Sequence, residues 1–400
     1  MNVIANRALQ VSPSLTLEIT AKGKKMKEDG LDVVSFGAGE PDFNTPAYIN
    51  EACKAALDGG LTKYTPASGA VELRKAIAAK LKKDNGLDYV YADIVVSNGA
   101  KHSLYNAFMA IVNPGDEVII PAPYWLTYPE LVKLADGVPV IVNADAADGF
   151  KLTPRALKAA VTKRTRAFVL NNPSNPTGAV YTEKELRALA EVLEDADIYV
   201  IADEIYEKLC YGIEPFSIAA ASERLKHNTI VVNGLSKTYS MTGWRVGYTA
   251  SNGAIARAMG GIQSHATSNA NTPAQYASIA ALQSPEGEKF LSRMRATFDR
   301  RRRLAVDMLK KMRPLTFVEP QGAFYIMAGI GAFIGKTLGG VTVKSASDFA
   351  NLLIDRARVV VIPCESFGAP EYIRLSYAVS DENIVKGLNR IARMCAEFED

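Results

Sequence analysis

Residues 229–245 read TIVVNGLSKTYSMTGWR: an apolar run, a short turn that carries glycine and hydroxyl side chains, and Lys237. The run Thr229–Asn233 predicts a buried β-strand. In an open α/β sheet the residues that follow such a strand face the ligand. A partly desolvated lysine beside another cation, here Arg245, loses its proton more easily and can form a Schiff base with a carbonyl cofactor. Because most lysines are solvated surface charges, this interpretation depends on the rest of the chain.

Similar apolar runs alternate with helical patterns from about residue 46 to residue 260. Continuous apolar strands between helices indicate a mostly parallel sheet that is covered on both faces. The predicted helices are Ala47–Asp58, Gly69–Asp84 and Glu183–Glu194, and the predicted strands are Ile94–Ser97, Glu117–Pro121, Pro139–Val142, Ala167–Asn171, Ile198–Ala202, Thr229–Asn233 and Val246–Ala250.

After Ser284 the pattern changes to a long charged helix, short strands and a last helix. The predicted elements are Gly287–Lys311, Ala323–Met327, Val359–Ile362, Tyr372–Tyr377 and Asp381–Glu397. A chain of 400 residues is also long for one core. We therefore expect a large α/β domain over residues 46–284, and a smaller α+β domain made of residues 1–45 and 285–400.

Composition excludes several classes of protein. The chain is 48% hydrophobic and 22% charged with a net charge of +3, so a nucleic-acid-binding face is not expected. The run Arg300–Arg303 is interpreted as the solvated face of a helix. Four scattered cysteines and three isolated histidines form no metal-ligand spacing, so no metal is expected. Residues 1–7 lack the apolar core of a secretory signal and no apolar run has membrane-spanning length, so we expect a cytoplasmic protein.

Five predicted strands are followed by side chains of distinct chemistry. Small residues that open a helix leave free N–H groups for a phosphate, an aromatic residue can cover a flat ring, and prolines can hold an amide in place. The side chains are Gly99 and Ala100 at a helix start, Trp125, Asn175 between two prolines, Asp203 with Tyr206, and Lys237 with Arg245. Together they supply what pyridoxal phosphate requires.

Seven motifs occur in order along nearly the whole chain. They are Gly37–Asp42 (GAGEPD), Lys63–Thr65 (KYT), Asn172–Gly178 (NPSNPTG), Asp203–Tyr206 (DEIY), Ser236–Arg245, Gly322–Tyr325 (GAFY) and Arg374–Tyr377 (RLSY). In these motifs the chain resembles the fold-type I, class I aminotransferases, in particular the bacterial branch of the aspartate aminotransferase family. The resemblance implies an α/β pyridoxal-phosphate enzyme with a mostly parallel central sheet and a smaller α+β domain.

The resemblance also implies roles at the cofactor. Lys237 would bind it as a Schiff base and later act as the base at the substrate Cα. Asp203 would pair with the pyridine nitrogen, Tyr206 and Asn175 would hydrogen-bond the phenolic oxygen, and Trp125 would stack on the ring.

Further residues would hold the phosphate, the neighbouring subunit and the substrate. The phosphate ligands would be Gly99, Ala100, Ser236 and Arg245, with Tyr64 reaching the phosphate of a neighbouring subunit, which implies a homodimer with shared sites. Arg374 would bind the substrate α-carboxylate through its planar guanidinium, helped by the Gly39 backbone. Many family members carry a phosphate-binding serine where this chain has Gly234, so fewer phosphate contacts are expected there.

Specificity for aspartate depends on a second cation, in addition to Arg374, that binds the side-chain carboxylate. The resemblance assigns the distal carboxylate of aspartate to Lys101, with hydroxyls from Ser14 and Thr16. The expected reaction moves the amino group of L-aspartate to 2-oxoglutarate in a two-stage ping-pong cycle. Prephenate, aromatic or alanine-type specificity stays open, although relatives that use prephenate tend to carry a basic residue where this chain has Ser12. A pyridoxal-phosphate lyase would share the same core residues, and a non-enzymatic binding protein would be expected to lose Lys237.

Overall fold

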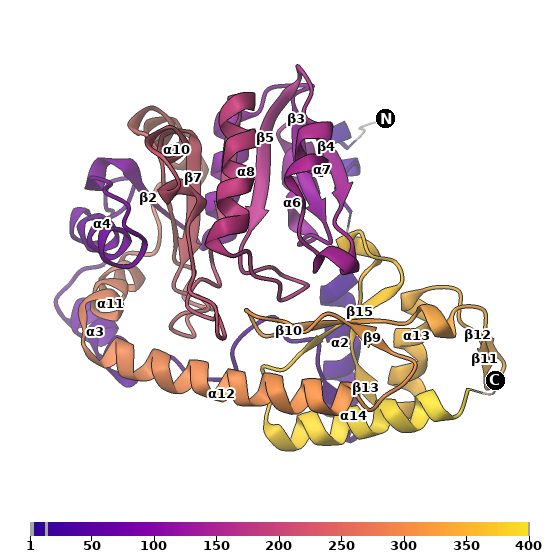
Figure 1. Cartoon of the computed structure of the whole chain (residues 1–400). Helices are drawn as coiled ribbons and strands as arrows, with labels where there is room; N and C mark the ends of the chain where they lie inside the picture. Colours follow the sequence, from indigo (N-terminus) through magenta and orange to yellow (C-terminus); the bar gives the residue numbers. More distant parts are fainter. Residues whose placement is uncertain (1–3, 13–14, 399–400) are drawn as a thin grey trace.

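The computed structural model describes residues 4–12 and 15–398 and contains two main sheets, with one long helix running beneath them (Figure 1). The larger sheet has seven strands in the order β2-β8-β7-β6-β5-β3-β4. Its strands are β2 (Ile94–Ser97), β3 (Glu117–Ala122), β4 (Val138–Asn143), β5 (Thr165–Asn171), β6 (Tyr199–Asp203), β7 (Thr229–Gly234) and β8 (Gly247–Ala250). Only β8 runs antiparallel to its neighbours, so the predicted mostly parallel α/β sheet is confirmed.

Helices cover both faces of this sheet, which explains why its strands are apolar throughout. In β5, Val169 belongs to a buried hydrophobic cluster that also contains side chains of α5 (Ala100–Ile111), α6 (Thr127–Leu134) and α10 (Gly253–Ala266). The preceding residue, Phe168, points to the other face. There it packs with α7 (Pro154–Ala160) and α8 (Glu183–Ala196).

The second sheet has four antiparallel strands in the order β14-β15-β10-β9. They are β9 (Thr316–Phe317), β10 (Tyr325–Gly329), β14 (Ile362–Pro363) and β15 (Tyr372–Ser376). The flanking helices are α2 (Leu15–Glu28), α13 (Ala346–Leu352) and α14 (Asp381–Ala396), and α12 (Glu286–Leu309) extends beneath both sheets (Figure 1). The remaining long helices, α3 (Ala47–Asp58), α4 (Val71–Asn85) and α11 (Thr272–Gln283), pack at the β2 end of the large sheet.

The single strand predicted over Val359–Ile362 is wrong. Residues Val359–Val360 form β13, which pairs in parallel with β1 (Val34–Ser35), whereas β14 pairs with β15. The hydrophobic pattern of these residues is continuous because all of them are buried, so the pattern alone does not reveal a change of pairing partner.

The basic run on α12 is only in part the predicted solvated face, because Arg300 and Arg303 are exposed whereas Arg301 and Arg302 are not. Arg301 is only 8% exposed, and its guanidinium pairs with Asp42 at 2.7 Å and Asp381 at 3.1 Å. Arg302 pairs with Asp299 and Glu319. The reason is that α12 lies between the N-terminal segment and α14, which supply carboxylates to one side of the run.

The predicted division into residues 46–284 on one side, and 1–45 with 285–400 on the other, stays a prediction. The separation of the two sheets supports it. Within the described ranges, none of the helices combines the length and the apolar character needed to cross a membrane.

Candidate active site

A cavity of about 310 Å³ opens where the carboxyl ends of five strands of the large sheet face the second sheet. The sequence-predicted residues that line it are Gly39, Ala100, Lys101, Trp125, Asn175, Asp203, Tyr206, Ser236, Lys237, Arg245 and Arg374. They come from the loops after β2, β3, β5, β6 and β7, from the N-terminal segment, and from β15. Parallel strands bring their carboxyl ends to one edge, and this geometry collects residues that are far apart in the sequence.

Asp203 is the last residue of β6 and lies buried at the floor of the cavity. One carboxylate oxygen accepts a hydrogen bond from the Tyr128 hydroxyl at 2.7 Å, and the other accepts from the main-chain N–H of Ile205 at 3.3 Å. Burial raises the pKa of Asp203 to about 6, against the opposing effects of these two hydrogen bonds and of the Lys237 charge. The site therefore offers a buried acid whose ionised form is stabilised by any cation placed against it.

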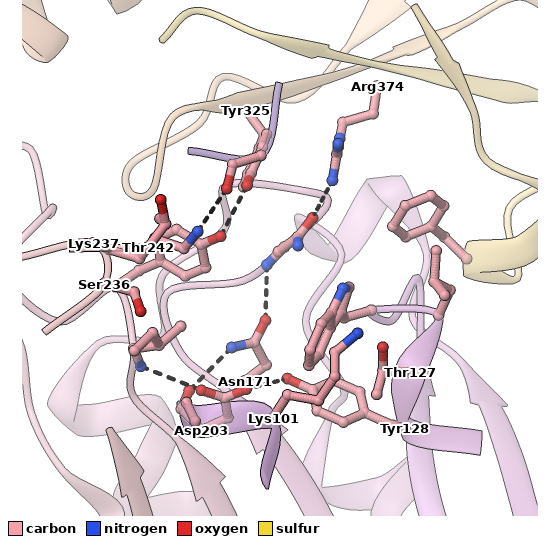
Figure 2. A pocket seen from close by; sticks show the side chains of 18 of the residues that line it. Lys101, Thr127, Tyr128, Asn171, Asp203, Ser236, Lys237, Thr242, Tyr325 and Arg374 are labelled. Carbon is pink, nitrogen blue, oxygen red and sulfur yellow. Dashed lines mark hydrogen bonds between the residues drawn. The ribbon is translucent and has the colours of Figure 1, made fainter. Parts of the chain in front are cut away.

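Lys237 follows β7, and its amine faces the cavity (Figure 2). The Nζ atom donates a hydrogen bond to the main-chain oxygen of Gly39 at 2.6 Å. Burial lowers the pKa of Lys237 to about 8, and the charges of Arg374 and Arg245 act in the same direction. Near neutral pH this lysine is thus far closer to the reactive neutral amine than an ordinary lysine is.

The start of α5 has the features of an anion-binding site. Gly99 adopts φ +84°, and a Cβ at this position would lie 2.4 Å from the Arg245 guanidinium. Gly247 is packed as closely, because a Cβ there would lie 2.2 Å from the main-chain nitrogen of Ala100. Arg245 itself has φ +58°, a conformation that is uncommon for a residue with a side chain and occurs often at functional sites. Free N–H groups at a helix start, a guanidinium and the Ser236 hydroxyl suit a phosphate.

Two pairs of side chains join the sheets across the cavity. The hydroxyls of Tyr206 and Tyr325 are 2.8 Å apart, and burial raises the pKa of Tyr206 well above its usual value. Arg374 Nη1 donates to Asn175 Oδ1 at 2.9 Å. Arg374 is 2% exposed, yet its Nε atom has no partner among the described residues. A buried guanidinium with an unused donor is suited to receive a carboxylate.

Lys101 stands at the mouth of the same cavity. Its ammonium lies 4.8 Å from the centre of the Trp125 ring. No carboxylate within the described ranges forms an ion pair with it. Partial burial and the nearby Arg245 lower the pKa of Lys101. In addition to Arg374 and Arg245, the cavity thus offers the Lys101 ammonium to a ligand.

Two predicted site residues, Gly99 and Tyr64, do not line the cavity, and the side chains of two others lie outside the described residues. Gly99 lies just behind it, under Arg245. Tyr64 is 87% exposed on the surface of this chain, so it makes no contribution to the cavity of its own subunit. Ser14 and the side chain of Thr16 lie outside the described residues.

Gly234, which stands where many family members carry a serine, is part of β7 and does not line the cavity either. A Cβ at this position would meet the main-chain oxygen of Val246 at 3.0 Å.

Other residues that line the cavity were not predicted as site residues: Leu126, Thr127, Tyr128, Asn171, Ile205, Thr242, Tyr325 and Phe367. Tyr325 belongs to one of the seven motifs, and Asn171 ends a predicted strand, so both carried a usable signal in the sequence. Tyr128 carried none. Its contact with Asp203 arises because α6 packs against β3 and β4, and from there the Tyr128 hydroxyl reaches the carboxyl end of β6.

This arrangement fits pyridoxal phosphate, a group with a dianionic phosphate, a basic ring nitrogen and a carbonyl. The helix start with Arg245 suits the phosphate, Asp203 suits the ring nitrogen, and Lys237 suits the carbonyl. A side chain at position 99 would fill the space beside the Arg245 guanidinium. Arg374 Nε has no hydrogen-bond partner among the described residues. Both observations are consistent with a site for a cofactor and a carboxylate substrate.

Comparison with known proteins agrees with this chemistry. The family described as aminotransferase class I and II matches residues 31–391. The chain is 47% identical to a probable aspartate/prephenate aminotransferase of Aquifex aeolicus, over 99% of each chain. It is also 47% identical to an aspartate aminotransferase of Bacillus sp. (strain YM-2), over 98% of each chain.

Solved structures give the same result. An aspartate aminotransferase of Thermus thermophilus with maleate matches with a TM-score of 0.93 and 39% identity, over 98% of this chain and 100% of that one. The aspartate aminotransferase of Rhizobium meliloti matches with a TM-score of 0.95 and 41% identity over the full length of both chains. The resemblance inferred from the seven motifs is confirmed, and the chain belongs to the class I and II aminotransferases as a pyridoxal-phosphate-dependent enzyme.

Proposed function

We propose that this aminotransferase moves the amino group of L-aspartate to 2-oxoglutarate, giving oxaloacetate and L-glutamate in two successive half-reactions. The observation that carries this proposal is a pair of cations on one cavity, Arg374 and Lys101, that form no ion pair with a carboxylate among the described residues and have no role in holding the cofactor. Both proposed amino donors, aspartate and glutamate, carry two carboxylates. Relatives named aspartate aminotransferase, at 45–47% identity, support the same substrate.

The cofactor, when bound, supplies a carbonyl that condenses with amines and a ring that accepts electrons. In our proposal Gly99, Ala100, Ser236 and Arg245 hold its phosphate. Asp203 keeps the ring nitrogen protonated, and the Tyr128 hydroxyl fixes the orientation of that carboxylate. Trp125 covers the ring, and Tyr206 and Asn175 hydrogen-bond its phenolic oxygen.

Lys237 has two roles in the proposal. Its amine attaches the cofactor, and once released by substrate it moves a proton from the substrate Cα. Burial favours both roles, because it lowers the pKa of Lys237 to about 8. A larger fraction of the lysine is then the neutral amine at physiological pH. The hydrogen bond to Gly39 O shows that the amine can reach the N-terminal segment at the edge of the cavity.

Arg374 and Lys101 orient the substrate. Arg374 would bind the α-carboxylate through its planar fork, together with the Gly39 backbone. Lys101 would meet the distal carboxylate, with Ser14 and Thr16 as further predicted partners. An ion pair gains strength in a cavity from which the substrate expels water.

Prephenate is the second candidate, because some relatives are named aspartate/prephenate aminotransferases. Prephenate also carries two carboxylates, so the two cations suit it as well. One feature argues against prephenate: this chain has Ser12 where relatives that use prephenate tend to carry a basic residue. The main-chain N–H of Ser12 donates a hydrogen bond to Glu130 Oε2.

A homodimer with shared sites is also part of this proposal. Its support is Tyr64, a large aromatic residue that is 87% exposed in the single chain. A tyrosine so exposed is available to a second copy, where it could reach the phosphate of that copy's cofactor. A cytoplasmic location is proposed as well, and the four unpaired cysteines support it.

The absorption spectrum of the bound cofactor tests the function directly. The loaded enzyme is mixed with L-aspartate, L-alanine or L-phenylalanine without any oxo acid, and conversion of the cofactor to its amine form is followed. We expect aspartate to convert it at far lower concentration than the other two. Preference for phenylalanine or alanine would overturn aspartate specificity. A turnover of aspartate without conversion of the cofactor would indicate elimination, and a separate assay with prephenate and L-aspartate measures the second candidate.

A further inference from the structure

Asn171 is the last residue of β5 and lies opposite Asp203, the last residue of β6, in the parallel register of the two strands. Its side chain lines the active-site cavity (Figure 2). It therefore occupies the floor of the site, directly beside the carboxylate proposed to hold the ring nitrogen.

Both the NH2 group and the oxygen of the Asn171 side-chain amide form hydrogen bonds. Its Nδ2 donates to the main-chain oxygen of Asp203 at 3.0 Å, and its Oδ1 accepts from the main-chain N–H of Asn175 at 2.8 Å. A main-chain N–H can only donate and a carbonyl oxygen can only accept, so these two partners fix the orientation of the amide. An ionised aspartate here would lack the donor, and a leucine would lack both groups.

The hydrogen bond from the Asn175 N–H to Asn171 Oδ1 holds the main chain of Asn175, which lies in the loop after β5. The side chain of Asn175 in turn accepts a hydrogen bond from Arg374 at 2.9 Å. A chain of hydrogen bonds therefore runs from Asp203 through Asn171 and Asn175 to Arg374 on the other sheet (Figure 2). Asn175 lies outside the strands, between Pro173 and Pro176, and the bond from its main-chain N–H to the Asn171 amide ties it to the large sheet.

We propose that Asn171 is a positioning residue, which holds Asn175 at the place from which its side chain serves both the cofactor and Arg374. This proposal rests on the role proposed above for Asn175. Asn171 acts through the main chain of Asn175, so its effect on the site exists only while the Asn175 side chain is present.

A double-mutant cycle tests the proposal. Asn171→Ala, Asn175→Ala and the double variant are compared by two measurements: the dissociation constant for pyridoxal phosphate, titrated onto cofactor-free protein, and kcat/KM for aspartate. We expect each single change to weaken both by roughly tenfold, as the loss of about one hydrogen bond implies. The double variant should be no worse than Asn175→Ala alone. A double variant whose loss is the product of the two single losses would overturn the proposal.

Asn172→Ala is the matched control. Asn172 is also buried, and its Oδ1 accepts from the main-chain N–H of Tyr181 at 2.9 Å, but it is not among the described residues that line the cavity. Its effect should combine independently with that of Asn175→Ala. Asn171→Leu repeats the cycle with a side chain of similar size in case the alanine variant unfolds.

Melting temperatures of the cofactor-free variants separate folding from function. If the Asn171 variants only lower the melting temperature, the residue is structural and the proposal fails. If Asn175→Ala alone changes neither the dissociation constant nor kcat/KM, then the role of Asn175 fails, and the positioning role fails with it. The spectral test with L-aspartate is independent of both outcomes.

Discussion

Arg374 Nη1 lies 2.9 Å from Asn175 Oδ1, and this hydrogen bond connects β15 of the small sheet with the loop after β5 of the large sheet. The residue proposed to bind the substrate carboxylate is thus in direct contact with a residue proposed to bind the cofactor. We expect a substrate carboxylate that binds Arg374 to compete for this bond or to reorient it, which would couple substrate binding to the surroundings of the cofactor.

Arg374→Lys should therefore be a severe change in spite of its unchanged charge. A lysine cannot donate two parallel hydrogen bonds to a carboxylate, nor keep the bond to Asn175 at the same time. We expect the KM for aspartate to rise at least roughly tenfold. Steady-state kinetics measure it, with exposed Arg300→Lys as the control. An unchanged KM would remove Arg374 from the substrate site.

The lowered pKa of Lys237 should be visible in the rate at which cofactor-free protein captures pyridoxal phosphate. Only the neutral amine reacts, so the rate rises with pH as the ammonium loses its proton. With a pKa of about 8, the midpoint of this rise should lie near pH 8, well below the midpoint for an exposed lysine. Stopped-flow absorbance gives the rates, and Nα-acetyllysine measured under the same conditions gives the pH profile of an exposed lysine for comparison. Lys237→Ala should form no reducible adduct, and an adduct that persists would refute the assignment.

Lys101 should discriminate between amino donors. Lys101→Met keeps much of the side-chain volume and removes the charge, so it should reduce kcat/KM for aspartate by roughly tenfold or more. Turnover of alanine, which has no distal carboxylate, should change little. Kinetics with both donors measure the ratio, and equal losses on both would show that Lys101 does not read the distal carboxylate.

Tyr64 should act in the site of a second subunit. Tyr64→Ala is expected to weaken cofactor binding, and Lys237→Ala abolishes attachment in its own subunit. When the two variants are mixed, unfolded and reassembled together, about a quarter of all sites should regain both residues by random pairing. Recovery of activity is measured against each variant reassembled alone. No recovery, from material that sedimentation shows to be dimeric, would place Tyr64 outside the partner's site.

Glu204 should make stability depend on pH. It is buried next to Asp203, with one carboxyl oxygen 2.6 Å from the Ser217 hydroxyl and the other without a partner among the described residues. Burial, with a further contribution from Glu207, raises the pKa of Glu204 from 4.5 to about 8. Because the folded state binds this proton more tightly, the contribution to stability is full below pH 4.5 and is lost as pH rises through 8.

Glu204→Gln imitates the protonated acid and should remove this dependence. We expect the free energy of unfolding of the wild type to fall, relative to the variant, by a few kcal/mol between pH 4.5 and pH 8. Urea unfolding of both proteins across this range gives the difference, in which the titration of other groups such as Asp203 cancels. Parallel curves would show that Glu204 titrates normally.

Much of the fold was predictable because hydrophobic periodicity is a local property. The strand β2 and the helix α3 begin and end where the sequence predicted, and the other strands of the large sheet differ by one or two residues. The wrong prediction at Val359–Ile362 shows the limit: burial gives a continuous apolar pattern, whereas the pairing partner depends on which other strand lies alongside.

The site followed from the sequence for a topological reason. Parallel strands place their carboxyl ends at one edge, so the residues that follow each strand, among them Asp203, Lys237 and Asn175, are predictable as neighbours from the sequence. What the chain order could not show is how separate elements pack. The contact of Tyr128 with Asp203, the burial of Arg301 between two carboxylates and the two-sided amide of Asn171 all depend on distances across the fold. The sequence by itself therefore determined which chemical groups reach the sheet edge, and the tertiary structure alone decided which of them touch, because contacts between distant segments are set by packing and not by local pattern.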